Sequence, residues 1–287
     1  MYAIRKTDLK LFTPNSQAVC RIEDGNTNAY LREDREIEEF LKTIEPKYNV
    51  ALEKLVANKI DTECIYTIAG FVAYVCSCSP AAMRIHMEAL KSRAETTVVR
   101  PDSQSQVPAS PSELGGLNLR EILKRGIRGV DADPKFSQAI GIASIRTNTA
   151  MFGNFRWEIL HNDFEDSAYF TSDFPVAIEP TSDSVPLNRV VPLAPNLAIR
   201  ILPYSRFDRE RASFSFSNFS YQSKRLDRKE VSQINKLIVR CAEEKVIFRD
   251  NHQWVSRFVH KNSGFRIEYD RHSSGIHLKE YKGGEGK

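Results

Sequence analysis

Carboxylates, one imidazole and a polar turn gather in residues 155–203, which hold the densest group of potentially reactive side chains in the chain. The turn at residues 171–175 places Ser172 and Asp173 between two strand-like runs, and strand ends commonly carry functional groups. We take Asp173 as a candidate catalytic residue and Ser172 as a candidate binding residue. The alternative is that Asp173 has only a structural role. It lies two residues before Pro175 in an ordinary turn, where its carboxylate would accept local backbone N–H bonds.

Further acidic residues and one histidine flank this turn, namely Glu158, His161, Asp163 and Glu179. Together with Asp173 they could hold Mg²⁺ or Mn²⁺, which bind carboxylate oxygens and water. Under this hypothesis Glu158 and His161 assist Asp173 in catalysis, and Asp173 and Glu179 are the metal ligands. Strand alternation argues against it, because Glu158 shares its face with an apolar side chain. The alternative is a solvated strand edge followed by a polar loop at residues 161–166.

Basic residues surround an aromatic and serine-rich segment, residues 212–222 (ASFSFSNFSYQ). Aromatic rings interleaved with cations can stack on and clamp single-stranded nucleic acid. The alternation of Phe214 and Phe216 with serines is also typical of a half-buried strand. The candidate binding residues for an anionic partner are Arg206, Arg209, Lys224 and Arg225.

Other reactive side chains give weaker signals. Glu45 and Tyr48 lie three residues apart on a predicted helix, where they could face a cleft together or simply cap a kink and pack a ring. The six histidines include no HExxH pair. The five cysteines have no zinc-knuckle spacing, and we interpret them as reduced thiols.

Composition and missing motifs bound the function. The net charge of +4 permits contact with an anionic partner but is below that of a typical duplex-binding domain. The sequence lacks GxxxxGK[ST], GxGxxG, GxSxG and CxxC, which argues against P-loop hydrolysis, Rossmann redox chemistry and α/β-hydrolase chemistry. No apolar run reaches the roughly 20 residues that span a bilayer, so we expect a cytoplasmic protein without membrane contact.

The elements predicted before residue 155 are mostly helices, and they must support the segment that carries the candidate side chains. A strand or hairpin arm is predicted at residues 2–12, and helical periodicity covers residues 32–58, with a kink near Pro46. Asp61 is the predicted N-cap of a buried helix at residues 64–78, and another helix follows to about residue 93. Residues 96–116 are rich in Ser, Pro, Gln and Gly and are predicted to be a mobile insert. Helices are expected at residues 117–125 and 133–151.

Strands dominate the next segment, at about residues 155–160, 169–171, 176–178, 190–193 and 198–202. Asp227 is the predicted N-cap of a helix at residues 228–244, residues 252–260 form a last helix, and the tail from residue 262 is expected to fray. The pattern predicts an α+β fold, in which a helical N-terminal half packs on a mixed or antiparallel sheet formed mainly by residues 155–220 and closed by C-terminal helices. We expect residues 1–287 to form a single interleaved domain with the insert at 96–116. The alternative is a helical unit, 1–95, and an α+β unit, 117–287.

Several separated segments together resemble one family. They are YAIRK, VCRIEDGNTNAYL, IEPKY, IAGFVAY, WEIL, FTSDFPV (residues 170–176), VVPLAP and a late helix containing Asn235. In this order they resemble the bacterial domain of unknown function 4238 family, across nearly the whole chain. The resemblance implies an uncharacterised protein and brings no activity with it.

Two departures from the family pattern matter. The N-terminal histidine, valine and proline segment of the family has no counterpart here, so we expect a shortened member. The arginine that often ends the buried helix is also absent, and Cys76 to Ser79 occupy that place. Two hypotheses remain open: a binding or regulatory protein contacting nucleic acid or another anionic partner, and a metal-assisted hydrolase, such as a nuclease, centred on Asp173.

Overall fold

The computed structural model describes residues 1–15, 28–31, 33, 35–99, 133–179, 187–204, 212–271 and 275–281, and every structural statement below concerns these residues. Three groups of predictions lie outside them. They are residues 100–116 of the predicted insert, the predicted helix at 117–125, and the candidate binding residues Arg206 and Arg209.

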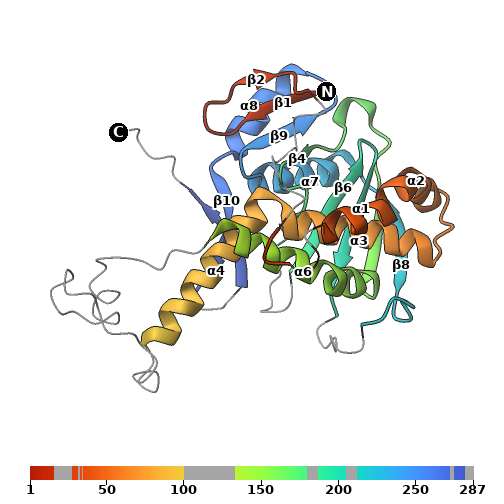
Figure 1. Ribbon diagram of the computed structural model, residues 1–287. Coiled ribbons are helices and arrows are strands. Elements are labelled where there is room, and N and C mark those ends of the chain that lie inside the picture. The colour runs from red at the N-terminus through yellow and green to blue at the C-terminus, as the bar shows by residue number, and fades with distance from the viewer. Residues whose placement is uncertain are drawn as a thin grey trace.

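Helices make up most of the N-terminal half (Figure 1). Helix α1 (Glu36–Ile44) and helix α2 (Tyr48–Val56) are separated by a 3₁₀ turn, η1 (Glu45–Lys47), because Pro46 cannot continue an α-helix. Asp61 caps the buried helix α3 (Thr62–Cys78) by accepting the N–H of Cys64 at 2.8 Å. These elements confirm the predicted kink and the predicted N-cap. Helix α4 (Pro80–Val99) and helix α6 (Pro134–Gly153) complete the layer.

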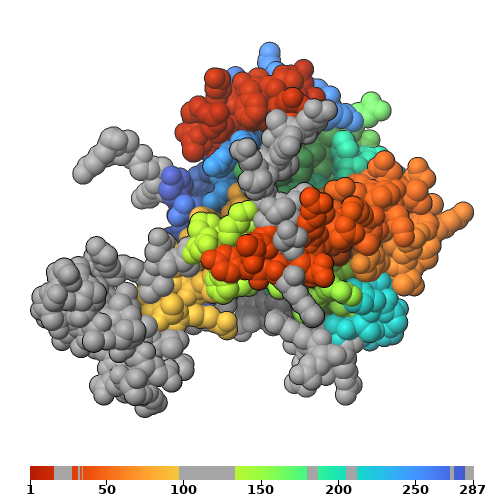
Figure 2. Space-filling view, viewed as in Figure 1, coloured from red at the N-terminus to blue at the C-terminus, as the bar shows by residue number. Residues whose placement is uncertain are grey.

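The helical layer is tightly packed around α3. The backbone of α6 approaches α3 at Gly141, where a Cβ atom would lie 2.4 Å from the Ser77 carbonyl oxygen. Only glycine therefore allows this crossing. In the space-filling view α1 and α2 continue this layer as one band below the N-terminal strands (Figure 2). None of the described helices is by itself long and apolar enough to cross a membrane, although α3 and the first part of α4 pass that test as a bent pair.

A five-stranded mixed sheet lies against this layer, in the order β5-β6-β7-β3-β8. Four of its strands confirm most of the predicted segment: β3 (Arg156–His161), β5 (Ala177–Glu179), β6 (Asn188–Ala194) and β7 (Leu197–Leu202). The fifth, β8 (Ser220–Arg225), was not among the predicted strands. Only the pairing of β3 with β8 is parallel. Trp157, fully buried, donates its indole N–H to the Phe152 carbonyl of α6, so one face of the sheet packs on the helices.

Residues before β8 correct one expectation. Alternation predicts a strand through Phe214 and Phe216, but the structure has turns there and the strand begins only at Ser220. Phe216 adopts a positive φ of 50° and is buried against Gly153, whose missing side chain makes room for the ring. This packing, which comes from a distant segment, overrides the local alternation.

A second sheet joins the N-terminal strands to strands from much later in the sequence, in the order β2-β1-β9-β4. Strand β1 (Tyr2–Arg5) pairs with β2 (Leu11–Phe12) on one side and with β9 (Lys245–Phe248) on the other. Strand β4 (Thr171–Ser172) follows the short 3₁₀ turn η4 (Glu165–Ser167) and closes the sheet.

Of the C-terminal elements, helix α7 (Arg228–Cys241) packs on β5 of the large sheet, and the others pack around α7 and α4. Helix α7 begins at a capping box formed by Asp227 and Glu230, as the sequence predicts, and α8 (Gln253–Asn262) packs beside it. The expectation of a frayed tail is wrong, because β10 (Phe265–Asp270) and β11 (Gly275–Glu280) form an antiparallel hairpin. The architecture is an α+β fold, as predicted.

Candidate functional site

Asp173 lies at the end of β4 and binds the turn between α7 and β9. One carboxylate oxygen accepts the N–H of Glu243 at 3.0 Å, and the other accepts those of Glu244 at 2.8 Å and Lys245 at 3.1 Å. Burial raises the pKa of Asp173, and the three N–H bonds oppose that rise. A carboxylate that accepts three successive backbone N–H groups fixes this turn in place.

The rest of the turn is bonded internally. The Ser172 hydroxyl donates to the Phe174 carbonyl at 2.7 Å and lies 3.2 Å from the Phe174 nitrogen. Ser172 is 4% exposed, so its hydroxyl is not presented to solvent.

Lys6, which follows β1, binds the same turn between α7 and β9. Its ammonium donates to the carbonyls of Ala242 and Phe265, each at 2.6 Å, and so binds the C-terminal end of α7. Burial lowers the pKa of Lys6 to about 8, against the opposing charges of Cys241, Asp173 and Glu243.

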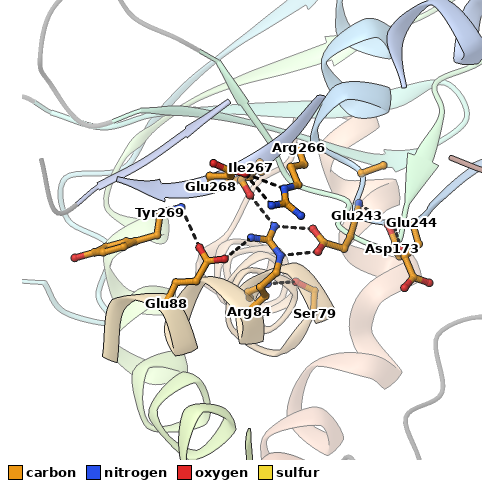
Figure 3. Close-up of polar contacts among 12 residues, drawn as sticks. Ser79, Arg84, Glu88, Asp173, Glu243, Glu244, Arg266, Ile267, Glu268 and Tyr269 are labelled. Carbon is orange, nitrogen blue, oxygen red and sulfur yellow. Dashed lines mark hydrogen bonds and ion pairs between the residues drawn. The ribbon is translucent and has the colours of Figure 1, made fainter. Parts of the chain in front are cut away.

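A network of ion pairs extends from this turn to α4 and β10 (Figure 3). The guanidinium of Arg84 binds Glu243 through two nitrogens, at 2.6 and 2.8 Å, and also donates to Glu88 at 3.1 Å and to the Ile267 carbonyl at 2.6 Å. Glu88 in turn accepts the N–H of Tyr269 at 3.4 Å. Asp173 therefore belongs to a polar region that joins four elements, and its partners are internal to the protein.

The sheet brings Glu158 and Glu179 together around one cation. Arg200 donates to Glu158 at 2.5 Å and to Glu179 at 3.2 Å, and Gln222 donates to the second oxygen of Glu158 at 2.8 Å. Arg200 Nε also lies 3.1 Å from Glu179, without the alignment of a hydrogen bond. The guanidinium occupies the position between the two carboxylates and compensates one of their two negative charges.

His161 lies apart from these carboxylates. It ends β3 three residues after Glu158 and so points to the other face of the sheet. Burial lowers its pKa, and so does the charge of Arg225, which pairs with Asp163. No hydrogen bond or ion pair among the described residues links His161 to Asp173. Within the described ranges no group of three His, Cys, Asp or Glu side chains could share a metal ion.

The two candidate basic residues that the structure describes lie on the exposed edge strand β8. Lys224 pairs with Glu230 at 2.5 Å, and Arg225 pairs with Asp163. Arg228, on the adjoining α7, pairs with Asp166 at 2.8 Å. Acidic neighbours thus compensate the positive charge on this surface.

Helix α8 presents basic residues that the sequence-based prediction did not select. Trp254, Arg257 and Lys261 are exposed and lie three and four residues apart, so they form one stripe on the helix surface. None of the described carboxylates pairs with Arg257 or Lys261. The spacing of the three residues is visible in the sequence, but only the orientation of the helix shows that this stripe faces outward.

The fold and these sites define an α+β protein. Its buried polar clusters bind the protein's own elements, and α8 carries an exposed basic stripe that has no carboxylate partner among the described residues. The chain belongs to a family described as protein of unknown function (DUF4238), whose sequence model matches residues 1–252. Helix α8 and the β10–β11 hairpin follow the matched region. Neither the curated proteins nor the solved structures contain a significant match.

Proposed function

We propose that this protein is a binding protein for an anionic macromolecule, and that the outer face of α8 contacts this partner. The observation that carries the proposal is the exposed stripe of Trp254, Arg257 and Lys261 on a helix that contains no Asp or Glu (QWVSRFVHKN). A basic stripe with no acidic side chain on its own helix attracts anions without internal competition.

The charge distribution supports this location. Residues 253–287 contain seven Lys and Arg against four Asp and Glu, a net charge of +3 out of +4 for the whole chain. By contrast, Lys224, Arg225 and Arg228 each pair with a carboxylate. Residues 253–287 therefore carry most of the chain's net positive charge.

The exposed tryptophan favours single-stranded nucleic acid as the partner. The Trp254 ring is 38% exposed, and its position is fixed by stacking on Phe170 at 5.8 Å and by an edge contact with Phe258. A fixed aromatic ring beside cations can stack on an unpaired base while the cations bind the phosphates.

The test is a fluorescence-anisotropy titration of labelled oligothymidylate of about 20 nucleotides, long enough for several binding-site lengths. The double variant Arg257→Gln/Lys261→Gln should bind at least tenfold more weakly. Because it lacks two phosphate contacts, the slope of log affinity against log salt should become shallower by about 1.4.

A matched control distinguishes loss of the α8 stripe from a general loss of positive charge. Lys42→Gln/Lys59→Gln removes the same charge from α1 and from the turn before α3, and should bind like the wild type. Equal weakening in both double variants, or no binding by the wild type, would contradict the proposal.

The metal-assisted hydrolase stays a prediction from the sequence, with Mg²⁺ or Mn²⁺ as its cofactor. The carboxylate of Asp173 accepts three backbone N–H groups, and the guanidinium of Arg200 lies between Glu158 and Glu179, where the metal ion would have to bind. No contact among the described residues favours it over the binding protein.

A further inference from the structure

An apolar cavity of about 310 Å³ lies between the two sheets and the helical layer. The turn joining β6 and β7 forms one wall, β4 and β9 form another, and α2 with α3 forms the third. Five of its lining residues are aromatic: Tyr48, Phe71, Tyr169, Phe170 and Phe248. Its volume falls in the range of small-molecule sites, which are typically lined by apolar and aromatic side chains with few polar groups.

The wall contributed by β6 has a fixed and irregular shape. The pairing of β6 with β7 shifts register between Pro192 and Ala194, which marks a bulge. The Leu193 carbonyl, inside the bulge, accepts a hydrogen bond from the Tyr48 hydroxyl at 3.2 Å. Tyr48 in turn contacts Phe71 with a centroid distance of 5.0 Å. The cavity is therefore preformed by contacts between distant elements.

Most of the lining residues, although not Arg249, come from the segments that carry the family resemblance. Tyr48 belongs to IEPKY, Phe71 to IAGFVAY, Phe170 to FTSDFPV, and Leu193 to VVPLAP. These segments are far apart in the sequence and meet at this cavity. All of them lie inside the part of the chain that the family model matches.

Arg249 supplies the only charged side chain among the described lining residues. Its Nε pairs with Asp250 and one Nη donates to the Glu165 carbonyl at 2.6 Å, which fixes the guanidinium. The second Nη has no hydrogen-bond partner among the described residues. The side chain is 45% exposed, which places it where the cavity meets solvent.

We propose that this cavity binds a small amphipathic carboxylate, with an aromatic or short acyl body among the aromatic rings and its carboxylate at Arg249. The volume is about twice that of an engineered cavity that holds benzene, which sets the size of the body. An arginine can bind a carboxylate with two N–H groups or one, and a single free Nη supports the second mode. The site is distinct from the α8 stripe and does not depend on it.

The test is isothermal titration of the full chain with 4-phenylbutyrate, with 4-phenylbutan-1-ol as its neutral counterpart. The carboxylate should bind at least tenfold more tightly than the alcohol, because only the carboxylate interacts with the guanidinium. Arg249→Gln should remove this difference while leaving binding of the alcohol unchanged. The exposed, ion-paired Arg271→Gln is the matched control and should behave as the wild type.

Filling the cavity tests the apolar half of the site. Ala194→Trp should abolish binding of both compounds. If Ala194→Trp does not fold, the comparison of Arg249→Gln with the wild type tests the proposal. No binding of either compound by the wild type, or full carboxylate affinity in Arg249→Gln, would overturn the proposal. Arg257→Gln/Lys261→Gln should bind 4-phenylbutyrate as the wild type does. The proposal for α8 and the proposal for the cavity can therefore be contradicted separately.

Discussion

Asp173 binds three successive backbone N–H groups with a single carboxylate, at distances of 2.8 to 3.1 Å. These groups begin the turn that leads from α7 into β9. At the residue scale this is the contact with the largest expected effect on stability, since three hydrogen bonds to one charged acceptor depend on the same side chain.

Asp173→Ala should lower the free energy of unfolding by about 2–4 kcal/mol, because three N–H groups lose their acceptor. Urea denaturation followed by circular dichroism measures the change. Asp8→Ala, which removes an exposed carboxylate bonded to the Lys10 N–H, is the control and should change stability by less than about 0.5 kcal/mol. If Asp173→Ala loses no more stability than Asp8→Ala, the structural role is contradicted. A urea midpoint that Mg²⁺ or Mn²⁺ raises in the wild type but not in Asp173→Ala would favour a functional role instead.

Two half-buried histidines, His86 and His161, make the stability of the protein depend on pH. Burial lowers the pKa of His86 and of His161 below the unfolded value near 6.5. As pH falls below about 6.5 the unfolded chain takes up protons that the folded chain does not, so stability present at neutral pH is lost. The urea midpoint should therefore drop between pH 7.5 and pH 5.5, and less so in His86→Gln/His161→Gln. An identical drop in both proteins would assign it to other groups.

At the element scale, three aspartates begin three helices. Asp61, Asp133 and Asp227 accept backbone N–H groups at the starts of α3, α6 and α7. The first and last were identified from the sequence as N-caps, and Asp133 with Pro134 as a helix start, because capping depends on neighbouring residues. Helical periodicity and the kink at Pro46 were predictable for the same reason.

Elements that depend on distant partners were not predictable. Strand β9 exists because it pairs with β1 at the opposite end of the chain, and β10 receives a hydrogen bond from Arg84 of α4. Likewise, the position of Arg200 between Glu158 and Glu179 follows from the register of the neighbouring strands β3, β7, β6 and β5. Local patterns identified the acidic side chains but contain no information on the cation between them.

The capping box of α7 gives a prediction at this scale. Asp227→Ala should lower the free energy of unfolding by about 1 kcal/mol, since the Glu230 N–H loses its acceptor at 2.8 Å. Thermal or urea unfolding measures it. Glu53→Ala, at an exposed interior position of α2, should change stability by less than about 0.5 kcal/mol. An effect of Asp227→Ala equal to that of the control would show that α7 is held by packing alone.

At the scale of the whole molecule, Arg84 joins α4, the α7–β9 turn and the C-terminal hairpin. Its side chain is 23% exposed and that of its partner Glu243 is 16% exposed, so the pair is partly shielded from water. Removing one partner of such a pair leaves the other charge without compensation. The network therefore holds the hairpin, which lies beyond the family-matched region, against that region.

Arg84→Leu should lower the free energy of unfolding by about 2–4 kcal/mol and speed amide exchange in β10 and β11. Hydrogen exchange followed by mass spectrometry measures the hairpin separately from the rest. Arg271→Leu breaks the exposed pair with Glu95 and should cost less than about 1 kcal/mol. Unchanged exchange in the hairpin of Arg84→Leu would contradict this role.

The two tryptophans allow a direct measurement of whether the partner binds the outer face of α8. Trp157 is fully buried, whereas Trp254 is 38% exposed on that face. Titrating oligothymidylate into the protein while recording emission at the red edge, where the exposed indole dominates, should quench Trp254, and added salt should reverse the quenching. Trp254→Phe should lose the signal. Binding detected by anisotropy without any quenching of Trp254 would place the partner elsewhere and contradict the account.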